Sequence, residues 1–421
     1  MHVMTIFLMF IVMSGFTPAR TEAKDHAVAH KKRALELQDI LSIALAHNPL
    51  LVERQSLVEQ KEGHALAASA YPNPTLDIQS GRGSLRDPSM GSPIMERYVT
   101  LSQPLEWPGT RHAEQRAARA SVQSAEAGLA QARLNVTAQV KQAFYTLLFF
   151  NRQHSLAMQN IQTVKRLYKA IQSKVKSGEA PPFDAIKMKV ETLKLQKERI
   201  RTTGASRTAQ ATLNSLTAGK LGTDFSIRGT FKSLPDDWNS SHFSEDTLSS
   251  HPAIIMGQKR VEEAQERHQK ELQARVPNVT LNGSYQRDIG REAFVGSLSI
   301  PLPLWHQRQG EIAQAKGVMR QEEATLLATR TQLRKDMSQH LQEIHMASAQ
   351  ISTYEHGLLA QAREALRIAQ VSFQYGETSL LEVLDAQRVM RETELEYTHA
   401  KYDLSIALTN LERLIGHAGH E

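Results

Sequence analysis

Cysteine is absent from the 421-residue chain. Without a thiol, the protein can form neither disulfides nor thiolate–metal sites, and it has no N-terminal cysteine that could carry a lipid. Aromatic residues make up only 6% of the sequence, which is typical of long helices rather than of a thick globular core. The net charge of +6 is spread along the chain without a basic block interleaved with aromatics, so nucleic acid is not expected as a partner.

Long apolar runs are also scarce. The one present, residues 3–16, is too short to span a bilayer comfortably as a helix. The small residue Ala23 follows it, so we expect a signal peptide over residues 1–23, although no lysine or arginine precedes the run. The alternative is a buried or anchoring helix. Beyond this run nothing approaches a transmembrane helix, so the mature protein would have to meet a membrane with strands.

Catalytic motifs are missing as well. The sequence has no glycine-rich phosphate loop, no nucleophile elbow and no HExxH, and its serine, histidine and aspartate residues are scattered along helical segments. This pattern argues against an enzyme, and it indicates no cofactor.

The sequence does contain a large internal repeat, in which three motifs recur in the same order at an offset near 200 residues. "LAHNPLL" (45–51) returns as "LSSHPAII" (248–255), "YPNPTLDIQSG" (71–81) as "VPNVTLNGSYQ" (276–286), and "VTLSQPLEW" (99–107) as "GSLSIPLPLW" (296–305). We therefore divide the mature chain into a first repeat, 24–216, a linker, 217–243, a second repeat, 244–416, and a short tail, 417–421.

Each repeat predicts the same series of elements. A helix is expected first, at 37–70 and again at 244–274, because a Pro-Asn step ends the apolar pattern there. Two strands follow, at 75–81 with 97–103 and at 278–288 with 294–300, where apolar and polar residues alternate. A proline, Pro104 or Pro301, is expected to close the second strand. A proline-free stretch then predicts a very long helix, 109–177 and 306–375, before a returning helix, 183–214 and 380–414.

A glycine separates the two long helices of each repeat. "KSGEA" places Gly178 before Glu179, and "QYGETS" places Gly376 before Glu377. Glycine takes the positive φ that ends a helix without strain. Each repeat is therefore expected to form a long antiparallel helical hairpin that turns at its glycine.

The predicted strands indicate an oligomer. Open strand edges cannot remain in lipid because their backbone groups would be unpaired, and small membrane barrels need about eight strands. Four strands per chain cannot close alone, so copies of the chain would have to share one barrel.

The duplicated plan, the "LSQPLEWPGTR" strand-to-helix junction and the "YGETSLLEVLDAQ" hairpin resemble the TolC-like outer-membrane efflux proteins. The resemblance covers about residues 37–416, and "PNPTLDIQSG" with "QPLEWPGTRHAEQRAARA" is most similar to the branch that serves heavy-metal-cation resistance pumps. It implies a mainly α fold with a small β part. In a homotrimer, duplicated helical hairpins would form an α-barrel in the periplasm, and four strands per chain would contribute to a 12-stranded transmembrane β-barrel in the outer membrane of a Gram-negative bacterium.

The resemblance also implies functional residues. Glu382 and Asp385 lie three apart on one helix face at positions where the family lines its periplasmic entrance with acids, and Asp184 occupies the matching place in the first repeat. This chain departs from the family where Thr378 and Phe373 stand at the positions of a latch arginine and a latch tyrosine. Ordinary solvated carboxylates are the alternative for Glu382 and Asp385.

The implied partners are a periplasmic membrane-fusion adaptor, an inner-membrane pump of the RND type and outer-membrane lipid. Gly178, Glu179, Gly376 and Glu377 form the turns at which the adaptor would dock. A weak metal pair, His417 and His420, lies three apart in the tail.

The function implied is a passive conduit that carries heavy-metal cations from the periplasm to the exterior. Two alternatives remain: an outer-membrane channel for multidrug efflux or type I secretion, and a periplasmic adaptor or structural protein built from helical hairpins.

Overall fold

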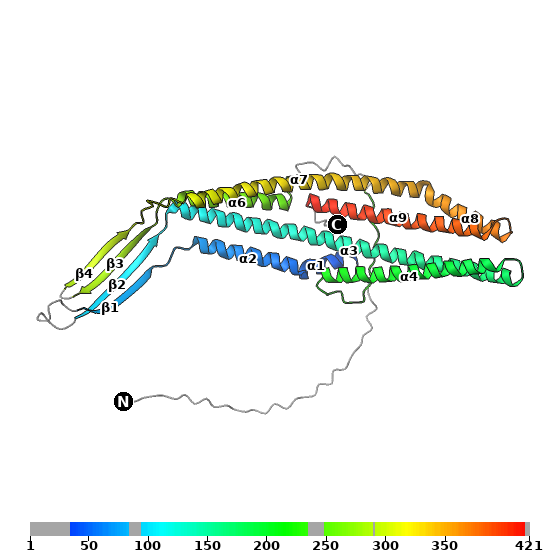
Figure 1. The fold of residues 1–421 in the computed structure, drawn as a ribbon, viewed down its shortest axis with the longest axis horizontal. Coiled ribbons are helices and arrows are strands. Elements are labelled where there is room, and N and C mark those ends of the chain that lie inside the picture. The colour runs from blue at the N-terminus through cyan, green and yellow to red at the C-terminus, as the bar shows by residue number, and fades with distance from the viewer. Residues whose placement is uncertain (1–33, 84–93, 235–247, 289–290, 417–421) are drawn as a thin grey trace, which may run out of the picture. The chain divides into compact units, whose positions relative to one another are not determined.

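The computed structural model describes residues 34–83, 94–234, 248–288 and 291–416 (Figure 1). The predicted signal peptide and the pair His417 and His420 lie outside these residues. The first half contains α1 (Leu37–His47), α2 (Pro49–Ser69), β1 (Thr75–Gly83), β2 (Ile94–Leu105), α3 (Pro108–Lys176) and α4 (Pro182–Leu216). The second half contains α6 (Pro252–Gln273), β3 (Val279–Asp288), β4 (Arg291–Ser299), α7 (Gln309–Thr353), the π-helix η3 (Tyr354–Leu358), α8 (Leu359–Gln374) and α9 (Leu380–Ile415).

The prediction of one helix over 37–70 is wrong, because α1 ends before Asn48 and α2 begins at Pro49. Proline lacks the amide hydrogen that a continuing helix needs and disfavours helix in the residue before it. The Asn48 side chain caps α2 by accepting a hydrogen bond from the amide of Leu50 (3.0 Å). The second half repeats this break, since α6 begins at Pro252 and His251 caps it.

The long first helix is confirmed, because α3 runs without interruption for 69 residues. The second long helix differs from the prediction over 306–375: it begins at Gln309, and η3 interrupts it between α7 and α8. A π-turn shifts the side-chain register of a helix at one point, and the repeating apolar pattern of the sequence does not reveal it.

The four strands form one antiparallel sheet in the order β1-β2-β3-β4. β1, β2 and β4 are longer than predicted, whereas β3 begins one residue later than predicted. Pro104 lies inside β2 opposite Thr280 instead of closing it. The pairing with β1 extends along β2 only as far as Ser102, so beyond that residue β2 has a neighbour on one side alone. A proline is tolerated there because its missing donor can face the unpaired side.

The two faces of the sheet have opposite character. Leu281 pairs with Leu298 and Tyr285 with Phe294, and Phe294 is 87% exposed. On the other face the amide of Asn282 donates to the hydroxyl of Ser297 (3.4 Å). One face of the sheet therefore exposes apolar side chains, and on the other face polar side chains bond to each other. In a sheet packed on a core the apolar face would be the buried one.

The helices are organised around α3. It packs against α2, α6, α4 and α9, and α9 packs in turn against α8, so four long helices lie side by side in the order α4, α3, α9, α8 (Figure 1). The largest apolar cluster joins α1, α3 and α4 around Ile40, Phe144 and Leu213. Among the described residues, every helix is too short or too polar to cross a membrane.

Candidate functional site

The two helical hairpins turn in the same way. Gly178 and Gly376 both have φ of 79°. At the first turn the amide of Glu179 donates to the carbonyl of Lys174 (2.8 Å), and at the second the amide of Glu377 donates to that of Ser372 (2.9 Å). Each glycine amide also bonds three residues back, so both turns are Schellman motifs. Both glycines therefore have the positive φ predicted for the turns, and their part in docking an adaptor stays a prediction.

The two returning helices begin differently. Pro181 and Pro182 start α4 without a side-chain cap, whereas the hydroxyl of Ser379 caps α9 by accepting from the amide of Glu382 (3.4 Å). Asp184 and Glu382 each lie in the first turn of their helix. A carboxylate there interacts favourably with the helix dipole, so both acids have a local structural role in addition to any role at an entrance.

Asp385 lies one turn further along α9. Its carboxylate accepts a hydrogen bond from the guanidinium of Arg388 (2.6 Å), and Arg388 also approaches Glu392 (3.6 Å). The hydrogen bond that Arg388 donates to Asp385, with the negative charges of Asp385 and Glu392, raises the pKa of Arg388 above its usual value. Glu382 and Asp385 are both exposed, but the charge of Asp385 is partly offset within the chain.

A small apolar cluster holds the two turns together. It includes Ile171 of α3, Met188 of α4 and Leu380 of α9, with Phe373 of α8 packed against it. The ammonium of Lys174 lies 5.0 Å from the centre of the Phe373 ring. The hydroxyl of Thr378 donates to the carbonyl of Ala369 (3.5 Å). The two residues at the family's latch positions therefore make contacts of their own within the chain.

A groove of about 600 Å³ runs between α4 and α9, just beyond this cluster. Asp385 and Arg388 line it, and Arg391 bridges it to Glu191 (3.3 Å). Charges of both signs face the groove, so the acids at the tips are not part of a uniformly negative surface in a single chain. Among the described residues, no group of three or more His, Cys, Asp or Glu side chains is placed to hold a metal ion.

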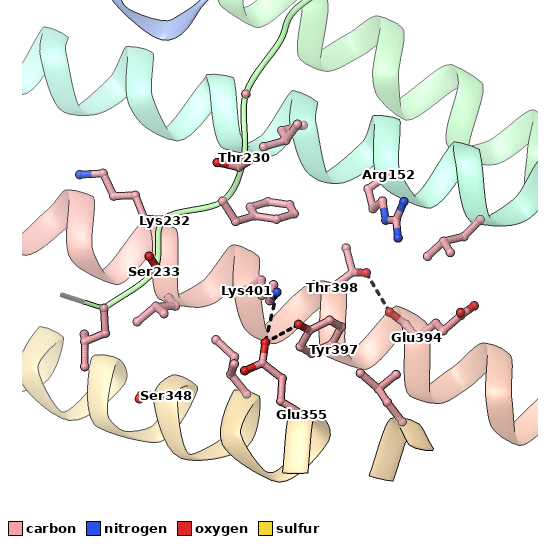
Figure 2. A pocket seen from close by; sticks show the side chains of 18 of the residues that line it. Arg152, Thr230, Lys232, Ser233, Ser348, Glu355, Glu394, Tyr397, Thr398 and Lys401 are labelled. Carbon is pink, nitrogen blue, oxygen red and sulfur yellow. Dashed lines mark hydrogen bonds and ion pairs between the residues drawn. The ribbon is translucent and has the colours of Figure 1, made fainter. Parts of the chain in front are cut away.

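A second groove, of about 610 Å³, was not predicted from the sequence and lies about halfway along the long helices. The segment 229–234, α3, η3 and α9 line it. Figure 2 shows Glu355 of η3 facing Tyr397 and Lys401 of α9; the tyrosine hydroxyl donates to Glu355, and the ammonium lies 3.4 Å away. The hydrogen bond from Tyr397 lowers the pKa of Glu355, although burial acts in the opposite direction.

Another missed feature lies nearby, at the partly buried Glu412 of α9. The ammonium of Lys141 donates to it (2.8 Å), and so does that of Lys232. Burial raises the pKa of Glu412, but the hydrogen bonds from the two lysines outweigh it and lower the pKa overall. This ion cluster connects the segment 228–234 with α3 and α9. No local sequence pattern predicts the cluster, because its three members are far apart in the chain.

Comparison with known proteins identifies the family. The model of the outer membrane efflux protein family matches residues 40–219 and 243–417. The cobalt-zinc-cadmium resistance protein CzcC of Cupriavidus metallidurans is 24% identical over 386 residues, which are 91% of this chain and 90% of that protein.

Solved structures share the fold. CusC superposes with a TM-score of 0.79 at 17% identity, over 91% of this chain and 92% of that chain. A membrane protein from Pseudomonas aeruginosa gives 0.79 at 18% identity, over 90% of each chain. The outer membrane protein VceC of Vibrio cholerae gives 0.78 at 18% identity, over 90% of this chain and 96% of that one.

Channels of this family assemble as trimers in tripartite efflux systems. The family model covers most of the chain. The protein therefore belongs to the outer membrane efflux protein family and is a non-enzymatic outer-membrane channel that extends into the periplasm.

Proposed function

We propose that the channel exports heavy-metal cations. The observation that carries the proposal is the similarity to a cobalt-zinc-cadmium resistance protein along 91% of the chain. The solved structures do not discriminate between cargoes, because they resemble this chain about equally in fold.

The acids at the helix tips fit this cargo. Glu382 and Asp385 are exposed in the first two turns of α9, and Asp184 begins α4. Three copies of the chain would arrange these carboxylates in rings at the end of the hairpins remote from the sheet. Such rings favour cations and disfavour anions in a narrow passage.

The sheet supports the shared barrel. Within the described residues β1 and β4 pair on one side only, and apolar side chains such as Phe294 are exposed on one face. Three copies supply the twelve strands that remove every edge, which is the condition for a sheet in lipid. Outer-membrane lipid then covers the exposed apolar side chains.

The two turns are the proposed docking surface for the periplasmic adaptor. Gly178 with Glu179 and Gly376 with Glu377 present similar backbone geometry at both tips, so an adaptor hairpin would meet two related surfaces in each chain. An inner-membrane pump of the RND type would select the cargo, and the channel would let it pass. The division into repeats 24–216 and 244–416, joined by 217–243, places one docking turn in each repeat.

Deletion of the gene tests the cargo. Loss of the channel should sensitise cells to one or more of zinc, cobalt, cadmium, nickel, copper or silver, while tolerance to detergents and dyes stays near normal. The wild-type gene should restore metal tolerance. Sensitivity to drugs with intact metal tolerance would contradict the proposal and favour a multidrug channel.

A further inference from the structure

One face of α4 is mainly apolar and has no neighbour among the residues that the structure describes. The residues of this face, the α4 stripe, are spaced alternately three and four apart, as in one seam of a coiled coil. Ile186 is 61% exposed and Ile200 is 67% exposed. The α4 stripe consists of Phe183, Ile186, Val190, Leu193, Lys197 and Ile200. It lies opposite the side of α4 that packs on α3, where Met188, Leu195 and Thr202 are buried.

A second stripe with the same spacing runs along α8 from the end of η3. Its apolar members are also exposed, with Tyr375 at 79% and Ile368 at 52%. The α8 stripe consists of Leu358, Gln361, Ala365, Ile368, Ser372 and Tyr375. It adjoins the side of α8 on which Ala362 is buried, since Ala365 lies three residues after Ala362.

The order of the helices places these two stripes at opposite ends of one row. Because α3 and α9 occupy the middle of the row α4, α3, α9, α8 (Figure 1), α4 and α8 each have a long-helix neighbour on one side only. When copies of such a row close into a ring, α4 of one copy meets α8 of the next. The two helices run in opposite directions, as an antiparallel pair requires.

Contacts inside the chain fix the relative height of the two stripes. Lys174 lies two residues before the end of α3, and Asp184 lies two residues after the start of α4, so the tight turn puts them at one height. The ammonium of Lys174 contacts the ring of Phe373, which places Phe373 near the same height. Rotation about an axis along the helices leaves heights unchanged, so Asp184 of one copy lies near the height of Phe373 of the next.

At this height the stripes match layer by layer. In two layers a large side chain faces a small one, with Leu193 opposite Ala365 and Ile186 opposite Ser372. In three other layers two large side chains meet: Phe183 opposite Tyr375, Val190 opposite Ile368 and Ile200 opposite Leu358. The polar residue of the α4 stripe, Lys197, meets Gln361, whose carbonyl can accept from the ammonium. A slip of one heptad, about 10 Å, would place Lys197 against Ile368 or Val190 against Gln361. Because a buried polar position specifies register in coiled coils, the sequence itself disfavours these slips.

We propose that α4 of one copy packs antiparallel against α8 of the next copy through these two stripes, with Leu193 opposite Ala365 and Lys197 opposite Gln361. The proposal rests on the trimeric assembly of the channel and is independent of its cargo. The occupant of both exposed stripes is a second copy of this chain, because each stripe supplies the complement of the other.

Disulfide cross-linking tests the seam, and the absence of native cysteine removes any background. The on-register variant combines Leu193→Cys with Ala365→Cys, and the matched control combines Leu193→Cys with Leu358→Cys, one heptad away. A disulfide needs Cβ atoms about 3.5–4.5 Å apart, which the proposed register allows only for the first pair. After oxidation of the purified full-length channel, denaturing non-reducing electrophoresis should show covalent dimers and trimers at least about tenfold more abundant for the first pair.

The outcomes separate the seam from the proposed function. Preferential cross-linking of the control pair would overturn the register. No cross-link in either variant, in a protein that is a trimer by native mass analysis, would overturn the seam and leave the metal-export proposal standing. Both variants should keep wild-type metal tolerance under reducing conditions if that proposal holds, since neither changes an acid of the entrance.

Discussion

The two hairpins of the chain follow one plan but differ along their first helices. In the first hairpin α3 is continuous and buried by α2, α6, α4 and α9. In the second, α7 and α8 are separated by the π-helix η3 and are mostly exposed. Burial on many sides favours a regular helix, because every turn must fit its neighbours. The exposed helix has room for a π-turn, a less favourable geometry that is common at functional sites.

The π-turn has specific partners on α9. The hydroxyl of Tyr354 donates to Glu396 (3.1 Å), Tyr397 donates to Glu355, and Lys401 pairs with Glu355. The two tyrosine rings lie 6.0 Å apart. The second hairpin is thus held at its irregular point by polar contacts. In the first hairpin α3 and α4 pack through apolar clusters near both ends of α4, and between these clusters the hydroxyl of Ser206 donates to Asn151 (2.8 Å).

Replacing the glycine at either hairpin turn should have the largest effect on stability, and the two effects should be equal. Gly178→Ala and Gly376→Ala each force alanine to a φ of 79°, which costs about 1–2 kcal/mol. Hydrogen exchange of the amides around each turn would measure the loss as a lower free energy of local opening.

The control is Gly204→Ala, at a position inside α4 where an added methyl group contacts nothing. There alanine should stabilise the helix by about 0.5–1 kcal/mol. Markedly unequal costs at the two turns would show that the hairpins do not share one turn geometry.

The sequence predicts the parts of the fold that local rules determine. Gly178 and Gly376 predict the two turns, and the period of two around Leu281 predicts a strand. The lack of proline between Pro108 and Pro181 predicts the length of α3. The acids Glu382, Asp385 and Asp184 were found from the family pattern, and the structure places each of them in the first two turns of its helix.

The remaining features depend on contacts between distant segments. The π-turn at Tyr354 requires partners on α9, and the cluster of Lys141, Lys232 and Glu412 joins three separate parts of the chain. Pro104 is compatible with β2 only because β1 stops short of it. None of these could be predicted from periodicity or composition.

The next largest effect should be confined to the second hairpin. Glu355→Ala removes the acceptor of Tyr397 and the partner of Lys401, and we expect a loss of about 1 kcal/mol because the carboxylate is partly exposed. Hydrogen exchange should increase in η3 and α8 but not in the middle of α3.

The matched control is Glu364→Ala, which removes an exposed ion pair with Arg367 within α8. It should change stability by less than about 0.5 kcal/mol. Equal effects of the two substitutions would argue against a special role for the contacts of Glu355 with Tyr397 and Lys401.

A smaller difference between the two halves of the chain should appear in how the free energy of unfolding depends on pH. Asn48 and His251 cap matching helix breaks, but only histidine titrates. The Nδ1 of His251 accepts from the amide of Ala253 (3.3 Å), and its Nε2 is buried without a hydrogen bond of good geometry. Burial lowers the pKa of His251; the charge of Arg413 acts in the same direction, and the backbone of Arg413 only partly offsets the effect.

Because the pKa of folded His251 lies below the unfolded value of 6.5, the unfolded state binds the proton more readily. The contribution of His251 to stability is therefore complete above pH 6.5 and decreases as the pH falls toward the folded pKa, by less than about 1 kcal/mol in mildly acidic buffer. His251→Asn, which copies the cap of the first half, should remove this part of the pH dependence in thermal unfolding. An unchanged pH profile would show that His251 is not its source.

Substitution of the two acids at the start of α9 should have the smallest effect on stability and the clearest effect on the ion selectivity of the channel. Glu382→Gln with Asp385→Asn changes exposed side chains, and the stability should shift by less than about 0.5 kcal/mol. In single-channel recordings the double variant should lose cation preference and become less sensitive to block by multivalent cations, because the acidic rings lose their charge. Asp184→Asn, which neutralises the acid in the first turn of α4, should have a smaller effect. Glu59→Gln with Glu62→Gln, an exposed pair of the same spacing on α2, should leave selectivity unchanged. If the α9 double variant kept its selectivity, the constriction would have to lie elsewhere, and these two acids would serve only the start of α9.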